Sequence, residues 1–231
     1  MSWGAIAVGT RMNDRCDPVF FNCWSHLLAR GLRPGDTLLD AAVELSQHYA
    51  ATVMAKFFLR SDADTLCMVD TDMIFKPDTL TRLRDDPQGW DYDILSALSV
   101  TRRKPFYPIL LRLKEESEKT PQCAFESMVN SIDGSVIAAD SVGTGFTLIR
   151  RRVFDLMREK MGIERWFFEF GPEGQGEDTN FCLRARELGL KIGVHTGVSI
   201  GHRGPLTFYW DAEKKMAMLE SHDQAKEIIT A

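Results

Sequence analysis

The sequence predicts an α/β protein in which helices flank a mostly parallel sheet. Short apolar segments recur along the 231 residues and end at glycine or aspartate, which is typical of buried strands that lead into loops. Segments with helical spacing and helix-capping residues stand between them. Strands that alternate with helices favour a parallel sheet, because each helix carries the chain back to the edge where the previous strand began.

The first half of the chain contains two clear apolar runs. Ala5-Ile6-Ala7-Val8 precedes Gly9, and Thr65-Leu66-Cys67-Met68-Val69 ends at an aspartate. Apolar residues recur every three or four positions after the turn Pro34-Gly35-Asp36, which indicates an amphipathic helix, and Pro77 suits the first turn of another. The predicted strands are residues 5–8, 65–69, 92–99 and 106–113, and the predicted helices are 37–60 and 77–84.

The second half repeats the alternation. Phe146-Thr147-Leu148-Ile149 is an apolar strand followed by a charged amphipathic segment. A later helix carries Phe181, Ala185 and Leu188 on one face, and Gly189 is typical of the residue that ends a helix. The predicted strands here are residues 146–149 and 191–194, and the predicted helices are 153–160 and 177–188.

Composition excludes several other classes of protein. The chain is 44% hydrophobic and 26% charged, with five cysteines that form no C-x-x-C pair, which favours a globular protein with reduced thiols. Its net charge of −5 gives no global attraction to nucleic acid or to an anionic membrane. No segment reaches the ~20 apolar residues of a membrane span, and the N-terminus lacks the basic region of a signal peptide. We therefore expect a cytoplasmic protein that does not bind membranes.

The most informative segment is Asp70-Thr71-Asp72, directly after the strand predicted at 65–69. Open α/β sheets bind ligands at the carboxyl ends of their strands, and residues two apart in an extended chain point to one side. Two carboxylates at that edge suit a hard divalent cation that carries diphosphate oxygens. The same residues are also typical of a turn with local side-chain hydrogen bonds. On this segment alone the two interpretations have equal weight.

Three further motifs follow the D-x-D segment. Gly143-Thr144-Gly145-Phe146 leads into a strand, Glu177-Asp178 begins a helix, and Gly201-His202 comes last. Together with the D-x-D they resemble the layout of GT-A glycosyltransferases of the family-2 type, in the compact form found in phages and bacteria. The resemblance runs from about Ile6 to His202. It implies a single GT-A domain over 1–231 with a Rossmann-like sheet, a donor and metal half at about 1–113, and an acceptor and catalytic half at about 136–205.

The resemblance implies a metal site and a donor site. Asp70 and Asp72 would coordinate Mn²⁺ or Mg²⁺ and, through it, the donor diphosphate, while His202 matches a histidine that ligates the metal in some relatives. An imidazole ligand favours Mn²⁺, because nitrogen suits transition metals better. Without the D-x-D, a buried core histidine would be the simpler interpretation of His202. The donor, expected to be a UDP-sugar, would contact Gly9, Thr10, Arg11, Gly143, Thr144 and Gly145.

The resemblance also assigns the acids at the start of the 177–188 helix. Asp178 matches the general base of inverting members, which takes the proton of the acceptor hydroxyl as that oxygen attacks the anomeric carbon. Glu177 would orient the acceptor. Both acids would also stabilise the positive end of a helix dipole without any catalytic role, by ~0.3–1 kcal/mol. Inversion at the anomeric carbon is the expected outcome, although a D-x-D with a histidine also occurs in retaining relatives.

The sequence determines the identity of the acceptor less well than that of the donor. A small molecule, a glycan, a protein and a modified nucleobase all fit a compact chain. Some phage enzymes of this kind decorate hydroxymethylated pyrimidines in DNA, so a hydroxymethylated DNA base, met in the host cytoplasm, is one expectation. Arg102 and Arg103, in a basic strip with Lys104, would then contact phosphates, although most such strips are solvated surface. Trp166 is a candidate wall for the acceptor, and Arg150-Arg151-Arg152 is a second basic triplet of uncertain role.

Two other functions compete with a glycosyltransferase. A sugar-1-phosphate nucleotidylyltransferase uses a glycine-rich loop that Gly9-Thr10-Arg11 partly imitates, but Ala7 and Val8 occupy positions where that loop needs glycine. It also leaves the late E-D and G-H motifs unexplained. A non-catalytic module that binds nucleotide-sugars is the second alternative, against which the intact acidic motifs and His202 argue.

Overall fold

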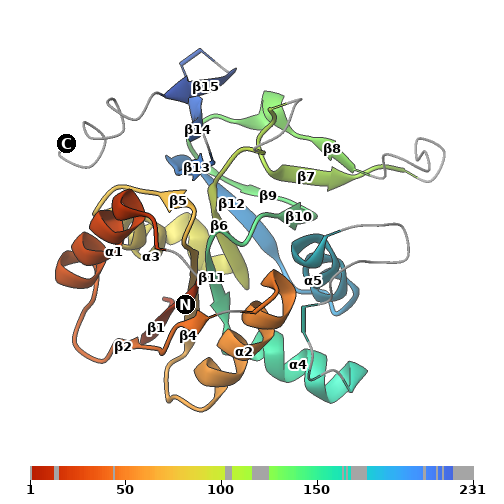
Figure 1. The fold of residues 1–231 in the computed structure, drawn as a ribbon. Helices are drawn as coiled ribbons and strands as arrows, with labels where there is room; N and C mark the ends of the chain where they lie inside the picture. The colour runs from red at the N-terminus through yellow and green to blue at the C-terminus, as the bar shows by residue number, and fades with distance from the viewer. Residues whose placement is uncertain are drawn as a thin grey trace.

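The computed structural model describes residues 2–12, 16–43, 45–101, 106–115, 125–162, 164, 166–167, 176–204, 207–211, 213–214 and 216–220. Within these ranges the core is an eight-stranded sheet (Figure 1). In spatial order its strands are β2 (Thr37–Leu38), β1 (Ile6–Met12), β4 (Thr65–Asp70), β11 (Phe146–Arg150), β6 (Ile94–Leu98), β12 (Ile192–Ser199) and β9 (Val136–Ala138), and β3 (Ala42–Val43) also pairs with β1.

The sheet is mostly parallel. Strand β1 pairs in parallel with β2, β3 and β4, and β6 pairs in parallel with β12. Strand β11 is antiparallel to both of its neighbours, β4 and β6, and β9 is antiparallel to β12. The predicted fold class, an α/β protein with a mostly parallel sheet flanked by helices, is therefore confirmed.

Helices cover both faces of the sheet. On one face Phe58 and Phe154 pack with ring centroids 5.7 Å apart, and on the other Phe75 and Phe146 pack at 5.0 Å. Along β4 the buried side chains alternate between these two cores, as the period of a strand requires. The first face carries α2 (Gln47–Leu59), α4 (Arg151–Met161) and α5 (Glu177–Glu187), and the second carries α1 (Pro18–Arg30) and α3 (Thr79–Asp85) (Figure 1).

Two small antiparallel sheets rise beyond one end of the central sheet (Figure 1). Pairing of β5 with β13 sets His202 opposite Met73, the residue directly after the D-x-D. The first small sheet contains β5 (Met73–Ile74), β13 (Gly201–Arg203), β14 (Thr207–Asp211) and β15 (Met216–Glu220), and the second contains β7 (Leu110–Leu113), β8 (Phe125–Ser127) and β10 (Ser141–Val142). Short 3-10 helices occupy Pro87–Asp91 and Val129–Ser131.

Most predicted elements are present with shifted ends, but the helix predicted at 37–60 is wrong in its first ten residues. Residues 37–43 instead form β2 and β3 at the edge of β1, where the Leu39 amide donates to the Val8 carbonyl over 2.8 Å. Asp36, the last residue of the turn before this segment, accepts from the backbone N–H groups of Ile6 and Arg33. Long-range pairing with β1 therefore overrides the helical pattern of this segment.

Two further differences concern the first strand and the helix after it. Strand β1 continues to Met12, so Gly9 lies inside the strand and not in a loop beyond it. Helix α1 was not predicted, although Asp17 and Pro18 carry the signal: the Asp17 carboxylate accepts from the Val19 amide over 2.8 Å, and proline takes the first helical position.

The first two arginines of the basic triplet at 150–152 donate hydrogen bonds to backbone carbonyls of other segments. Arg151 donates to the carbonyl oxygens of Leu59, Ser61 and Ala63, at and beyond the end of α2, and its guanidinium lies 4.6 Å from the centre of the Phe58 ring. Arg150 donates to three other carbonyls and stacks on a tryptophan. The carbonyls left without partners at a helix end are thereby satisfied.

In the part of the chain that is described, no helix is both long and apolar enough to span a bilayer.

Candidate functional site

A pocket of about 140 Å³ lies at the carboxyl ends of β1 and β4. Asp70 is the last residue of β4, and Asp72 follows in the turn before β5. Helix α5 contributes its first turn and β13 its histidine, so segments that are far apart in the sequence meet here. Of the residues predicted for the site, the pocket is lined by Arg11, Asp70, Asp72, Gly143, Gly145, Glu177, Asp178 and His202.

Asp70 forms a two-pronged ion pair with Arg11. The Nε and Nη2 atoms of Arg11 lie 2.5 and 2.6 Å from the two carboxylate oxygens. The register of the parallel strands sets these two residues opposite each other. Burial opposes the charged form of Arg11, which is only 7% exposed, but the surrounding carboxylates outweigh it and raise its pKa. Burial raises the pKa of Asp70 in turn, and Arg11 offsets part of that rise.

Asp72 faces His202 on the other side of the pocket. The Nε2 atom of His202 lies 3.4 Å from Oδ2 of Asp72, and its Nδ1 atom lies 2.9 Å from the Val100 carbonyl oxygen. A carbonyl only accepts, so Nδ1 carries a proton. The Nε2 atom is then left facing a carboxylate oxygen, an arrangement that a cation between the two atoms would stabilise.

These contacts test the predicted metal site. Asp72 and His202 fit a divalent cation, because an oxygen and a nitrogen face each other and the second ring nitrogen is held by a carbonyl. Asp70 differs, since both of its oxygens already bind Arg11. Among the described residues no group of three or more potential ligands is gathered closely enough for a metal. The ion pair with Arg11 makes Asp70 a weaker candidate ligand than Asp72, and the ligand roles of Asp70, Asp72 and His202 stay predictions.

Glu177 and Asp178 form the first turn of α5. The Thr144 amide donates to Oδ2 of Asp178 over 3.1 Å, and the Thr144 hydroxyl donates to Oδ1. The Oε1 atom of Glu177 lies 4.0 Å from the Nη1 atom of Arg11. Burial and the neighbouring charge of Asp178 raise the pKa of Glu177. Because Asp178 accepts from a loop outside its own helix, stabilisation of the helix dipole alone does not account for its contacts.

The pocket carries an excess of negative charge. Asp70, Asp72, Glu177 and Asp178 line it, against Arg11 and His202. Carboxylates confined in a partly buried site attract cations and raise the pKa of their neighbours. The electrostatics of the pocket therefore favour a bound cation.

The predicted donor glycines have packing roles in this structure. A side chain at Gly9 would meet Sδ of Met54 at 2.1 Å, and one at Gly145 would meet Met73 at 2.6 Å. Gly9 and Thr10 lie within β1 and do not line the pocket. The Met54 and Met73 side chains leave no room for a side chain at Gly9 or Gly145, while Gly143 and Gly145 also line the pocket.

Trp166, predicted as a wall for the acceptor, is not brought to the pocket. Trp166 is 3% exposed, packs edge-on against Phe154 at 5.6 Å and donates its indole N–H to the Phe154 carbonyl. Its indole is therefore part of the hydrophobic core and cannot form an exposed wall. Arg102 and Arg103 lie outside the described residues.

Sequence reasoning missed other residues of the pocket. Gln47, Met73, Ser99 and Ile109 also line it. Thr144, which the sequence did predict, is fully buried between two lining residues, Gly143 and Gly145. Gln47 is the first residue of α2, which sequence reasoning placed within a longer helix. The D-x-D and G-T-G motifs marked the neighbourhood, but no local signal links Arg11 to a residue 59 positions away.

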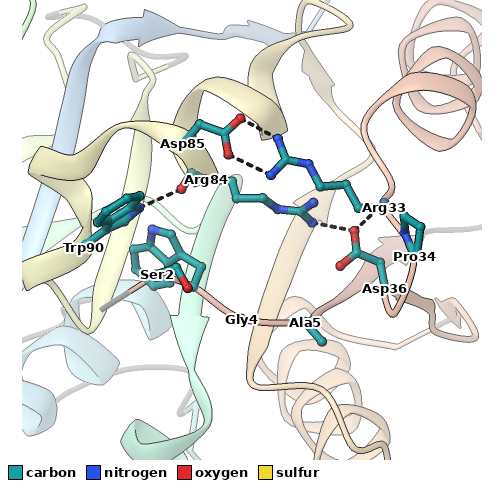
Figure 2. Close-up of a pocket in the computed structure, with 10 residues that line it drawn as sticks. Ser2, Gly4, Ala5, Arg33, Pro34, Asp36, Arg84, Asp85 and Trp90 are labelled. Atoms are coloured by element: carbon teal, nitrogen blue, oxygen red, sulfur yellow. Dashed lines mark hydrogen bonds and ion pairs between the residues drawn. The ribbon is translucent and has the colours of Figure 1, made fainter.

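A second cavity, of about 370 Å³, lies at the opposite, amino end of β1 (Figure 2). Its charged side chains form ion pairs with each other, Arg33 with Asp85 and Arg84 with Asp36 (Figure 2). The Trp90 indole donates to the Arg84 carbonyl over 2.9 Å. These pairs tie the turn before β2 to α3 and leave the cavity without net charge, in contrast to the carboxyl-end pocket.

Comparisons with known proteins show a similarity of fold. The sequence matches no protein-family model, and no curated protein is significantly similar to it. Among solved structures, A197 from STIV aligns over 94% of this chain and 94% of its own, with 14% identity and a TM-score of 0.55. A mutant Drosophila beta-1,4-galactosyltransferase 7, crystallised with manganese, UDP-Gal and xylobiose, aligns over 97% of this chain and 79% of its own, with 17% identity and a TM-score of 0.50. The chain therefore has a GT-A-like fold.

Proposed function

We propose that this protein is a metal-dependent glycosyltransferase that moves a sugar from a nucleoside-diphosphate sugar to an acceptor hydroxyl with inversion. The observation that carries the proposal is that the Asp72–His202 pair and the Asp178 carboxylate line one pocket at the carboxyl ends of the strands. A GT-A-like fold and the similarity to a galactosyltransferase fold support it. We take residues 1–231 as one catalytic domain, with the donor side at about 1–113 and the acceptor side at about 136–205.

Asp72 and His202 would hold the cation, Mn²⁺ in preference to Mg²⁺ because one ligand is nitrogen. When bound, it would act as a Lewis acid that neutralises charge on the departing diphosphate. Arg11 supplies a second positive charge to the same pocket. Its Nη1 atom is buried and has no hydrogen-bond partner among the described residues, so it can donate to an oxygen of the donor.

Asp178 is the general base. It would take the proton of the acceptor hydroxyl as that oxygen bonds to the anomeric carbon and the bond from this carbon to the diphosphate oxygen breaks. Attack from the side opposite the leaving group inverts the configuration. Glu177, beside Asp178 in the first turn of α5, would hydrogen-bond to the acceptor and orient it.

The size of the pocket constrains how the donor lies. Its volume of about 140 Å³ is below the ~300–1,000 Å³ typical of sites that enclose a whole ligand. We propose that the cation and the diphosphate of a UDP-sugar occupy it, while the nucleoside and the sugar extend beyond it. For the acceptor we propose a hydroxymethylated base in DNA, whose binding by Arg102 and Arg103 should weaken steeply with salt.

A screen of nucleotide-sugars with Mn²⁺, read by release of nucleoside diphosphate, tests the function. Release from one donor that requires Mn²⁺ and is lost in Asp178→Asn is the expected result. Formation of pyrophosphate from a sugar-1-phosphate and a nucleoside triphosphate would instead identify a nucleotidylyltransferase. Binding of a nucleotide-sugar without either reaction would identify a non-catalytic module. Activity on hydroxymethylated DNA that does not change with salt would exclude the proposed phosphate contacts.

A further inference from the structure

The Thr144 side chain contacts two charged residues of the acidic pocket, Arg11 on β1 and Asp178 on α5. It stands between β10 and β11, and its side chain is fully buried. Its hydroxyl oxygen lies 3.1 Å from Nη2 of Arg11 and within hydrogen-bond distance of Oδ1 of Asp178. A buried hydroxyl with partners on two sides has its direction set by the chemistry of those partners.

The direction of both hydrogen bonds follows from the partners. A guanidinium only donates, so the Thr144 oxygen accepts from Arg11. The single hydroxyl proton is then left for the Asp178 carboxylate, which accepts it. The Thr144 amide donates to the other oxygen of Asp178 over 3.1 Å. One residue therefore holds both oxygens of this carboxylate and determines its orientation.

The far end of this chain of hydrogen bonds is anchored in the sheet. Arg11 is held by Asp70 through two short contacts, and the pairing of β1 with β4 sets these two residues opposite each other. Pairing of β4 with β11 sets Phe146 opposite Val69 and so fixes the loop that carries Thr144. The sequence of contacts Asp70, Arg11, Thr144, Asp178 thus extends from the centre of the sheet to the first turn of α5.

We propose that Thr144 is a positioning residue that fixes the Asp178 carboxylate for proton removal and joins it, through Arg11, to Asp70. The inference rests on the proposed function, because it assigns to Asp178 the role of base. A carboxylate with one lone pair on each oxygen engaged keeps its other lone pairs for the acceptor hydroxyl. Loss of the threonine hydroxyl frees one oxygen and allows the carboxylate to turn away from the acceptor.

The test compares Thr144→Val, which keeps the shape and removes the hydroxyl, with Thr144→Ser, which keeps the hydroxyl. For Thr144→Val we expect kcat to fall by ~10–100-fold while the KM for the donor stays within about twofold, because misorientation of a base affects the chemical step. Thr144→Ser should recover most of the loss. Thr196→Val is the matched control, a buried threonine whose hydroxyl donates to the Ser135 carbonyl far from the pocket.

A second measurement does not need activity. In a double-mutant cycle of Thr144→Val and Asp178→Ala, urea unfolding measures the free energy of unfolding of each variant. The losses of the two single variants should sum to clearly more than the loss of the double variant. If Thr144→Val does not fold, Thr144→Ala removes the same hydroxyl without placing a methyl group against Arg11 and Asp178. Additive effects in the cycle, wild-type kcat in Thr144→Val, or a Thr144→Ser variant as slow as Thr144→Val would each overturn the proposal. A wild-type enzyme without transferase activity would overturn the proposed function, and the cycle would still report on the contact.

Discussion

Arg11 and Asp70 lie opposite each other on neighbouring parallel strands, and the guanidinium of Arg11 binds both oxygens of the Asp70 carboxylate. The two residues of the D-x-D therefore differ in what they contact, since Asp72 faces His202. Each oxygen of Asp70 keeps a free lone pair, but the positive charge of the adjacent guanidinium repels a cation and makes Asp70 a weaker metal ligand than Asp72. This asymmetry separates a structural aspartate from a candidate ligand.

The asymmetry predicts different consequences for the two aspartates. Asp72→Asn should weaken Mn²⁺ binding by ~10–100-fold, and Asp70→Asn should change it by less than about threefold. Asp70→Asn should instead lower the free energy of unfolding by ~3–5 kcal/mol, because Arg11 is left buried without its partner. Titration calorimetry with Mn²⁺ and urea unfolding measure the two effects. Asp85→Asn, in an exposed ion pair with Arg33, is the control. Equal losses of Mn²⁺ affinity in Asp70→Asn and Asp72→Asn would contradict the assignment.

Asp178→Asn should lower kcat by ~10²–10⁴-fold, because an amide cannot take the proton of the sugar acceptor's hydroxyl group. Binding of the donor with Mn²⁺ should remain, since the cation is assigned to Asp72 and His202. Single-turnover kinetics and calorimetry with the nucleoside diphosphate separate the two properties. Near-wild-type turnover in Asp178→Asn would show that another group is the base.

Glu177 should make stability depend on pH. Its pKa in the folded protein is raised above the ordinary value of 4.5, first by burial and then by Asp178. The folded state therefore holds this proton more tightly than the unfolded chain does, and stability falls as pH rises from 4.5 through the raised pKa. Glu177→Gln removes this loss, so its stability relative to wild type should increase across that window and level off above it.

Urea midpoints of the wild type and Glu177→Gln at a series of pH values between 4 and 8 measure this effect. Glu187→Gln, at the exposed end of the same helix, is the matched control. A Glu177→Gln variant that loses stability relative to wild type as pH rises would contradict the direction of the shift.

Arg151→Met should destabilise the protein by ~2–4 kcal/mol, because several carbonyls at and beyond the end of α2 lose a charged donor while the aliphatic bulk is kept. Arg158→Met, which removes an exposed ion pair with Asp155 on the same helix, should cost less than ~1 kcal/mol. Urea unfolding measures both. Equal costs would show that the carbonyl contacts of Arg151 add little to stability.

The local sequence pattern was sufficient to predict the elements whose formation depends on residues close together in the sequence. The apolar run at 65–69, the acids that open α5 and the glycine after it are visible in sequence because strand burial and helix capping act over a few residues. The segment at 37–43 was mispredicted as helix because its pairing with β1, more than 25 residues away, decides its conformation.

The sequence by itself determined the α/β class, the edge of the sheet where the acidic motifs gather and the identity of most pocket residues. The tertiary structure alone decided their contacts: that Arg11 binds Asp70, 59 residues away, that Thr144 holds Asp178, and that Trp166 belongs to the core. The physical reason is strand order. The antiparallel insertion of β11 between β4 and β6 brings the G-T-G loop beside the D-x-D, and pairing between strands distant in sequence leaves no local pattern.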